Sequence, residues 1–167
     1  MQVMNRLYLL RHAKARWAEP GSSDYDRPLA SSGHADAERL GAVMAANGQV
    51  PDMVLCSGAR RARETWVAVS RNLPVADMRF IDDLYSSDAS GYLHLVRQAG
   101  ASRSILVVGH NPMMEDLATA LSRTGDKVAM ASVARGFPTC GLAVLRFSTP
   151  LSHIEPEDGY LEAFLTP

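Results

Sequence analysis

The sequence is poor in cysteine, has no long apolar run and shows no concentration of charge of one sign. Its 167 residues include two cysteines, Cys56 and Cys140, with 17 basic and 18 acidic side chains. Two cysteines are too few for a disulfide framework and lack the spacing of a metal site, although a single bridge between them stays open. The balanced charge gives no sign of a nucleic-acid-binding tract or of a polybasic membrane anchor.

The amino terminus has no basic segment followed by a long apolar stretch, so we expect no signal peptide. Together with the scarcity of cysteine, this absence favours a reduced, cytoplasmic protein. A chain that is 47% hydrophobic and 21% charged fits a soluble globular protein with a substantial core. Because no repeat, low-complexity tract or linker interrupts it, we expect one domain over residues 1–167.

Short apolar runs alternate with helical patterns through residue 121. We expect strands at 7–10, 53–56, 78–81 and 104–108, and helices at 31–47, 60–72, 89–98 and from 112 to beyond 121. Residues 122–139 look irregular, and 141–147 and 160–165 form two last strands. Such alternation is typical of βαβ units, so we predict an α/β fold, a three-layer α/β/α sandwich with a largely parallel central sheet.

Helix boundaries follow from capping residues. Ser31 or Ser32 is expected to cap the first helix, and Gly48 to end it in a left-handed conformation. We expect the apolar face of this helix to consist of Ala37, Leu40, Val43 and Met44. Asn111 is a suitable N-cap for the helix that follows, with Pro112 as its first residue.

Polar residues follow three of the expected strands, at the point where each strand ends. Arg11 and His12 follow the first strand, Arg60 and Arg61 the second, and His110 the strand at 104–108. Parallel strands place all of these at one edge of the sheet, where ligands bind in open α/β folds. The helices that begin after the second and fourth strands aim free N–H groups at the same edge. The sequence therefore predicts a pocket for a dianion, with phosphate as the obvious candidate.

Three motifs carry a family resemblance. They are Leu9-Leu10-Arg11-His12-Ala13, Ser57-x-x-x-Arg61-Ala62-x-x-Thr65 and Val108-Gly109-His110-Asn111-Pro112. In this order and at this spacing they resemble the histidine phosphatase, or phosphoglycerate mutase-like, superfamily. Within this superfamily, the chain is similar to the SixA-like phosphohistidine phosphatase branch. The shared features are the short length, Asp26-x-Pro28-Leu29 followed by Gly33, Leu84-Tyr85, and Phe137-Pro138-Thr139.

The resemblance implies a role for each motif residue and requires no metal or organic cofactor. His12 would be the nucleophile, Arg11 and Arg61 would clamp the phosphoryl oxygens, and His110 would complete the pocket. A nucleophilic histidine must be neutral on its attacking nitrogen, so its other nitrogen needs an acceptor, which we expect in the backbone near Ser57 or Gly109.

Two further residues are candidates for phosphate contact. Asn111 follows the second motif histidine, and Arg27 lies on the loop after the first motif. Arg27 has the alternative of pairing with Asp24 or Asp26. The superfamily's usual Arg-His-Gly is Arg-His-Ala here, so the backbone at Ala13 must avoid conformations reserved for glycine.

No general acid is evident in the sequence. Asn111 and the segment 84–87 stand where the superfamily often carries a carboxylate, and we interpret Asp82, Asp83 and Asp88 as surface or capping residues. An alcohol leaving group needs a proton, whereas an imidazole already protonated on its far nitrogen departs neutral. We therefore predict hydrolysis of phosphohistidine on a partner protein.

Three other functions compete with this prediction. A small-molecule phosphomonoesterase of the same superfamily, acting on a small phosphate ester, and a non-catalytic phosphate-binding domain both stay open. A cysteine phosphatase does not, because the position six residues after Cys56 is Ala62 rather than arginine. Oligomeric state is not visible in the sequence.

Overall fold

A seven-stranded sheet forms the centre of the molecule, with the strand order β3-β2-β4-β1-β6-β7-β5. The computed structural model describes residues 3–99 and 101–167. The strands are β1 (Asn5–Arg11), β2 (Met53–Cys56), β3 (Asp77–Phe80), β4 (Ser104–Gly109), β5 (Ser122–Gly125), β6 (Leu142–Phe147) and β7 (Gly159–Leu165). The pairs β3/β2, β2/β4, β4/β1 and β5/β7 are parallel, and β6 is antiparallel to both of its neighbours.

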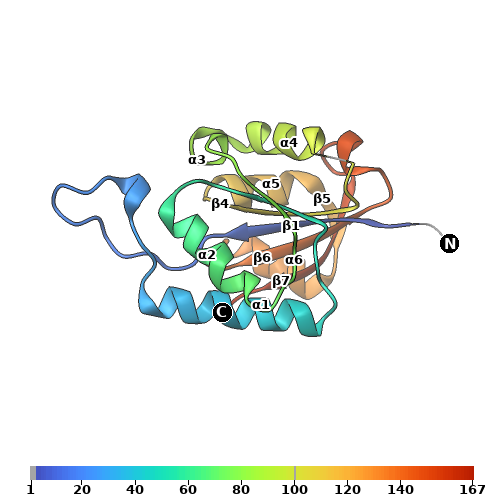
Figure 1. Ribbon diagram of the computed structural model, residues 1–167. Coiled ribbons are helices and arrows are strands. Elements are labelled where there is room, and N and C mark those ends of the chain that lie inside the picture. The colour runs from blue at the N-terminus through green and yellow to red at the C-terminus, as the bar shows by residue number, and fades with distance from the viewer. Residues whose placement is uncertain (1–2, 100) are drawn as a thin grey trace.

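Helices cover both faces of the sheet (Figure 1). They are α1 (Ser31–Ala46), α2 (Arg60–Ser70), α3 (Asp83–Ser86), α4 (Ala89–Gln98), α5 (Met113–Leu121) and α6 (Lys127–Ala134), with 3-10 turns η1 (Asp24–Asp26) and η2 (Leu151–His153). Alternate residues of β1 supply the two apolar cores: Leu7 and Leu9 join α4 and α5, whereas Tyr8 and Leu10 join α1 and α2. The predicted α/β/α sandwich is therefore confirmed.

The expected strands and helices before residue 121 are present within a few residues of their predicted bounds. Gly48 has the expected positive φ of 69°. Two details of α1 were wrong: Ala30 precedes the helix without a side-chain cap, and Val43 is exposed. Gly33 and Gly41 are buried on this helix, because the close approach of neighbouring backbone leaves room only for glycine there.

The segment 122–139 is not irregular, as the sequence suggested. It contains β5 and α6, and the side chain of Asp126 caps α6 by accepting from the N–H groups of Val128 and Ala129 at 3.0 Å. β5 has no apolar run and exists through its pairing with β7 at the edge of the sheet. Local periodicity could not show this strand because the partner supplies its hydrogen bonds.

The start and end of α5 also differ from expectation. Pro112, not Asn111, occupies the N-cap position, and the helix ends at Leu121. The Asn111 side chain instead donates to the carbonyl oxygen of Phe137 at 3.1 Å, and it accepts from the N–H of Glu115 one turn into the helix. Cys56 and Cys140 are free, buried thiols, so the bridge left open by the sequence is not formed. Within the described residues, no helix has the length and apolar character needed to span a membrane.

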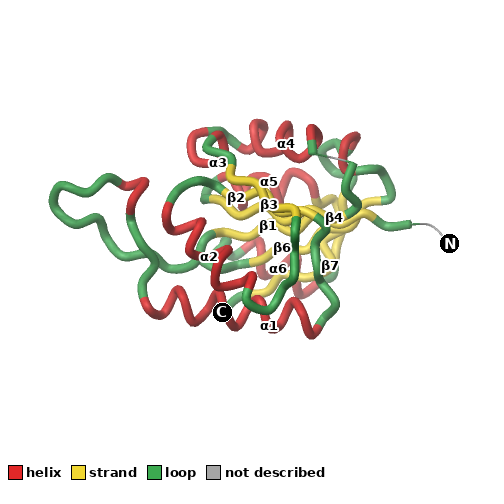
Figure 2. The backbone as a smooth tube through the Cα atoms, in the orientation of Figure 1, coloured by secondary structure: helices red, strands yellow, loops and turns green. Residues whose placement is uncertain are grey.

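The loop between β1 and α1 projects beyond the strand ends (Figures 1 and 2). It contains η1 and a bridge between Ala15 and Leu29. The carboxyl ends of β1, β4 and β2 lie side by side beneath it, with Arg11 opposite Gly109 and Cys56 opposite Val108. This register decides which side chains meet at the site.

Gly41→Ala tests the packing of α1 on α2. A Cβ at this position would lie 2.3 Å from the carbonyl oxygen of Val69, which is backbone and cannot rotate away. We expect the free energy of unfolding in urea to fall by about 1–3 kcal/mol, although alanine favours helices over glycine. Ala45→Ser on the exposed face of α1 is the control, with an expected change within about 0.5 kcal/mol. A stabilised Gly41→Ala protein would contradict this packing.

Candidate active site

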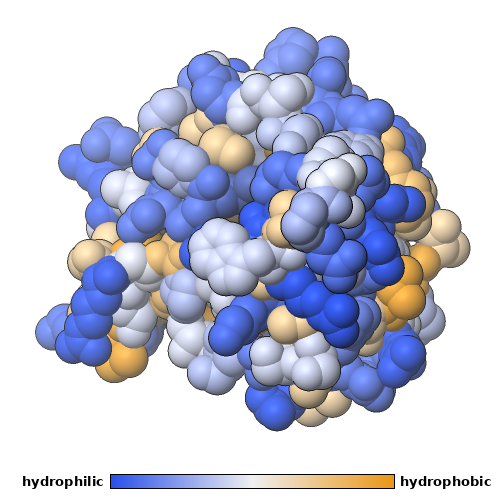
Figure 3. All heavy atoms as spheres, turned by 90° about the vertical axis from the view of Figure 1, so that its left-hand side faces the viewer, coloured by the Kyte–Doolittle hydropathy of each residue, from blue (hydrophilic) through white to orange (hydrophobic). Residues whose placement is uncertain are grey.

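The candidate site lies at the carboxyl ends of three neighbouring parallel strands. Just past β1, the N–H of His12 donates to the carbonyl oxygen of Gly109 at 2.9 Å, which extends the β1–β4 ladder. Just past β2, the N–H of Ser57 donates to Val108 in the same way. His12, Ser57 and His110 are therefore brought together by sheet register. Hydrophilic residues predominate on the side of the molecule toward which the β1–α1 loop projects (Figure 3).

His12 is buried and held in one tautomer. Its Nδ1 lies 2.7 Å from the carbonyl oxygen of Ala13, which can only accept, so the ring proton is assigned to Nδ1. Nε2 then carries a lone pair, and it accepts from Nε of Arg61 at 3.3 Å. Burial lowers the pKa of His12 to about 4, assisted by the charges of Arg61 and Arg11. A neutral imidazole with an available Nε2 has the form that a nucleophile requires.

The acceptor for His12 differs from the expectation, which placed it near Ser57 or Gly109. The backbone turns directly after His12, so the following carbonyl faces the ring. Ala13 is fixed by its own N–H, which donates to Oγ1 of Thr65 at 3.0 Å, and Thr65 donates to the carbonyl oxygen of Arg61. Ala13 has no positive φ, so the replacement of the superfamily's glycine causes no strain.

Arg61 lies in the first turn of α2, with its guanidinium buried between His12 and the η1 turn. Nη1 donates to the carbonyl oxygen of Asp24 at 2.7 Å, and Nη2 lies 3.1 Å from Oδ2 of the same residue. These contacts hold the guanidinium plane in place, although it has further N–H groups that they do not use.

Arg11 presents a second guanidinium to the site. Its Nη1 donates to the carbonyl oxygen of Phe137 at 2.8 Å, the atom that also receives the Asn111 amide. Its Nε is buried and has no partner among the described residues. A buried N–H without an acceptor costs free energy, which an oxyanion bound there would recover.

His110 completes the group, with its ring centroid 5.3 Å from that of His12. Its Nε2 lies 2.8 Å from Oγ of Ser57, which also accepts from the N–H of Ala59. Nδ1 is buried with no partner in the described part of the chain. Burial, then the nearby charges of His12 and Arg61, lowers the pKa of His110 to about 3. If Ser57 donates its proton to Nε2, the Nδ1–H of His110 becomes a second donor that lacks an acceptor.

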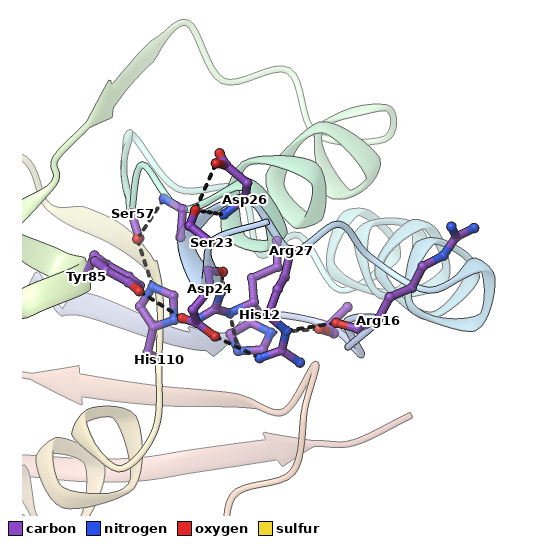
Figure 4. A network of polar contacts seen from close by, with 12 residues as sticks. His12, Arg16, Ser23, Asp24, Asp26, Arg27, Ser57, Tyr85 and His110 are labelled. Carbon is purple, nitrogen blue, oxygen red and sulfur yellow. Dashed lines mark hydrogen bonds and ion pairs between the residues drawn. The ribbon is translucent and has the colours of Figure 1, made fainter. Parts of the chain in front are cut away.

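Asp24 and Tyr85 also lie at this site (Figure 4). From the sequence, Asp24 was expected only as a partner of Arg27, and Tyr85 only as part of a family motif. Oδ2 of Asp24 accepts from the Tyr85 hydroxyl at 2.8 Å as well as from Arg61, and the Tyr85 ring lies edge-on to His110 at 5.5 Å. Partial burial alone would raise the pKa of Asp24, but hydrogen bonds from Tyr85 and Arg27 and the charge of Arg61 lower it to about 2. No spacing pattern links Asp24 to Arg61, so only the folded loop reveals the contact.

Arg27 pairs with Asp24, one of the two alternatives that the sequence left open. Nη1 of Arg27 lies 3.1 Å from Oδ1 of Asp24, and Nε donates to the carbonyl oxygen of Arg16. The Arg27 guanidinium also lies over the exposed ring of Trp17, 5.5 Å from its centroid. Arg27 therefore reaches the site through Asp24.

The other candidate acids lie in supporting positions. Asp88 caps α4 by accepting from the N–H of Gly91, as the sequence indicated, and Asp83 is exposed in the first turn of α3. Asp82 accepts from the Tyr25 hydroxyl at 2.6 Å and does not cap a helix with its side chain. Burial raises the pKa of the Cys56 thiol, which fits an inert core residue. In the described ranges, no group of three histidine, cysteine or acidic side chains is placed to hold a metal ion.

The buried histidines predict a specific dependence on pH. The pKa values of His12 and His110 lie at about 4 and about 3, below the ordinary 6.5, so the unfolded chain takes up their protons first. The free energy of unfolding should therefore fall as the pH decreases from about 6.5 toward about 4. The ring signals of His12 and His110 can be assigned by their loss in His12→Asn and His110→Asn. In an NMR titration of the wild-type protein, these signals should show that both rings are neutral at pH 6. Protonation of both rings near pH 6.5 would contradict the burial described here.

Comparison with known proteins agrees with this geometry. The family model described as histidine phosphatase superfamily (branch 1) matches residues 7–89. An uncharacterised protein of Mycobacterium tuberculosis is 35% identical, over 95% of this chain and 99% of its own.

The crystal structure of a candidate phosphohistidine phosphatase SixA from Agrobacterium tumefaciens has a TM-score of 0.83 at 39% identity, over 98% of this chain and 99% of the other. A protein histidine phosphatase SixA complexed with tungstate shares the fold, with a TM-score of 0.78 at 20% identity over 96% of each chain. These likenesses support phosphatase activity. The chain belongs to the histidine phosphatase superfamily, in its SixA-like branch.

Proposed function

We propose that this chain, as a single domain over residues 1–167, is a protein phosphohistidine phosphatase in which His12 carries the phosphoryl group transiently. One observation carries the proposal. The Nδ1–H of His12 donates a hydrogen bond to the Ala13 carbonyl oxygen, so the lone pair is on Nε2, beside Arg61. The charge of Arg11 acts on His12, and its Nε has no partner among the described residues, which supports binding of an oxyanion beside His12. Phosphoryl transfer is catalysed mainly by such positioning and charge stabilisation.

The reaction would proceed in two steps. A phosphoryl oxygen replaces His12 Nε2 as the acceptor for Arg61, and the freed lone pair attacks phosphorus. The bond between phosphorus and the substrate nitrogen breaks, and the electron pair leaves with that ring. Water then attacks the phosphoryl group on His12, and the bond between phosphorus and Nε2 breaks with its electron pair returning to the His12 ring. A proton of the water passes to a phosphoryl oxygen, and inorganic phosphate is released. Splitting one hard displacement into two easier ones is the advantage of a covalent intermediate.

The electrostatics of the site favour a leaving group that needs no proton. Asp24, the carboxylate bound to Arg61, has a pKa of about 2 and therefore holds no proton to give at neutral pH. An alcohol leaves poorly without one, whereas an imidazole protonated on its far nitrogen leaves neutral. The likeness to a candidate phosphohistidine phosphatase from Agrobacterium tumefaciens supports the same substrate class. The free thiols of Cys56 and Cys140 fit a reducing compartment such as the cytoplasm.

The proposal is tested by comparing three substrates: a phosphohistidine-bearing protein, an aryl phosphate and an alkyl phosphate. We expect kcat/KM to fall in that order, with the alkyl ester hydrolysed slowest. His12→Ala should lose at least about a thousandfold in kcat on phosphohistidine, because the nucleophile is gone. A rapid quench of the wild-type protein should trap a phosphoryl group that His12→Ala does not acquire. Activity that survives in His12→Ala, or a preference for the alkyl ester, would refute the proposal.

Asp82→Asn tests whether Asp82 acts as the general acid that the sequence does not reveal. Because Asp82 is engaged by Tyr25, we expect kcat on the aryl phosphate to change by less than about threefold. A general acid would contribute about a hundredfold or more, with the greatest loss on the alkyl ester. A loss of that size would identify Asp82 as the proton donor. Asp88→Asn, which removes a surface charge but keeps the side-chain oxygen that caps α4, serves as the control for changes in surface charge.

A further inference from the structure

The Asp24 carboxylate is linked to His12 through the Arg61 guanidinium. Arg61 joins the two ends of this arrangement, because its Nε contacts His12 Nε2 and its Nη2 contacts Asp24 Oδ2 at 3.1 Å. A phosphoryl group held by Arg61 and attacked by His12 must therefore bind beside Asp24. The side chain of Asp24 is 53% exposed, so it is accessible from solvent on the outer side of Arg61.

Asp24 also retains hydrogen-bonding capacity. An ionised carboxylate accepts up to about four hydrogen bonds. Asp24 accepts three, from Arg27 on Oδ1 and from Arg61 and Tyr85 on Oδ2. Oδ1 therefore keeps an acceptor position, and the three donors hold the carboxylate in one orientation.

We propose that Asp24 is a specificity-determining residue: it accepts a hydrogen bond from the far ring nitrogen of the substrate's phosphohistidine and stabilises that ring as an imidazolium. The inference rests on the proposed function and names the part of the substrate that Asp24 would recognise. Asp24 itself gains and loses no proton. The imidazolium keeps its N–H, the electron pair of the broken bond to phosphorus neutralises the ring, and neutral imidazole leaves.

This role explains how a carboxylate can be useful beside a phosphate pocket. A fixed negative charge repels a phosphoryl dianion, which works against binding of any phosphate ester. An imidazolium leaving group reverses the balance, because the opposite charge attracts it and favours its protonated form. An aryl or alkyl ester has no such N–H, so Asp24 offers it only repulsion. Asp24 would thus make the site selective for phosphohistidine over phosphate esters.

Four titratable or charged groups face Asp24: Arg27 from the same turn, Arg61 from α2, Tyr85 from α3 and His110 from the loop after β4. Hydrogen bonding to Asp24 raises the pKa of Tyr85 above its ordinary value. His110 has its pKa at about 3 because of burial. The substrate imidazolium is therefore the group whose titration near neutral pH Asp24 would alter.

Asp24→Asn is the test, with Asp26→Asn as the matched control. Asp26 lies in the same η1 turn, and its side chain contacts Ser23 instead of Arg61. The amide in Asp24→Asn removes the charge with little change of shape, and the contact of Arg61 with the Asp24 backbone carbonyl is retained. We expect the ratio of kcat/KM for phosphohistidine to that for the aryl phosphate to fall at least about tenfold, and to stay unchanged in Asp26→Asn.

The pH profile gives a readout that loss of structure would not. In the wild-type protein, the alkaline limb of kcat on phosphohistidine should lie at higher pH than in Asp24→Asn, because Asp24 favours the protonated substrate ring. Asp24→Glu, which keeps the charge, should restore the limb toward its wild-type position. The aryl phosphate should show no such displacement.

The outcomes separate this inference from the proposed function. If wild-type protein hydrolyses phosphohistidine but Asp24→Asn loses activity equally on both substrates, or keeps the same ratio, Asp24 only supports Arg61 and the inference is overturned alone. If wild-type protein hydrolyses the aryl phosphate and not phosphohistidine, the inference and the proposed function fail together. A lower ratio with the displaced alkaline limb supports both.

Discussion

The parallel pairing of β1 with β4 is the constraint on which the site depends. The register sets Arg11 opposite Gly109, and the N–H of His12 adds one more hydrogen bond to the ladder through the Gly109 carbonyl. From the other side, the N–H of Cys140 donates to the carbonyl oxygens of both Arg11 and His12. Cys140 holds a positive φ of 59°, a conformation that favours glycine, and this strain accompanies its contact with the two motif residues. A slip of one residue in this register would turn each side chain of β1 to the other face of the sheet and would move Arg11 and His12 out of the site.

Burial then converts these positions into chemistry. The histidines lose contact with water, so their neutral forms are favoured, and the His12 lone pair is available far below the pH at which free imidazole would be protonated. Among the residues that the structure describes, the same burial leaves Nε of Arg11 and Nδ1 of His110 without a hydrogen-bond partner. A buried donor without an acceptor costs free energy, and a phosphoryl oxygen is the kind of acceptor that would recover it at Nε of Arg11.

The sequence predicted the features that are encoded locally. Buried strands appear as apolar runs, and the motif residues lie directly after them, so both the sheet edge and the group Arg11, His12, Arg61 and His110 could be anticipated. β5 escaped because its hydrogen bonds come from β7 and not from any pattern of its own. Asp24 and Tyr85 escaped for a related reason: they meet across 61 positions of the chain, through a loop whose course no periodicity describes. Side-chain contacts between loops depend on the whole fold, whereas strand and helix patterns do not.

The contacts of Arg61 show how the site can be rigid before substrate arrives and still receive it. His12 and Asp24 accept hydrogen bonds from Nε, Nη1 and Nη2 of Arg61, and these contacts restrain the orientation of the guanidinium. The guanidinium also has N–H groups that these contacts do not use. Of its contacts to His12 and Asp24, an incoming phosphoryl oxygen would have to displace only the longest, the 3.3 Å hydrogen bond from Nε to His12 Nε2. In the proposed reaction, that exchange would free the lone pair as phosphorus comes within reach. The contacts of Arg61 to Asp24 are shorter, so the residue that fixes Arg61 would stay beside the departing group throughout the proposed transfer.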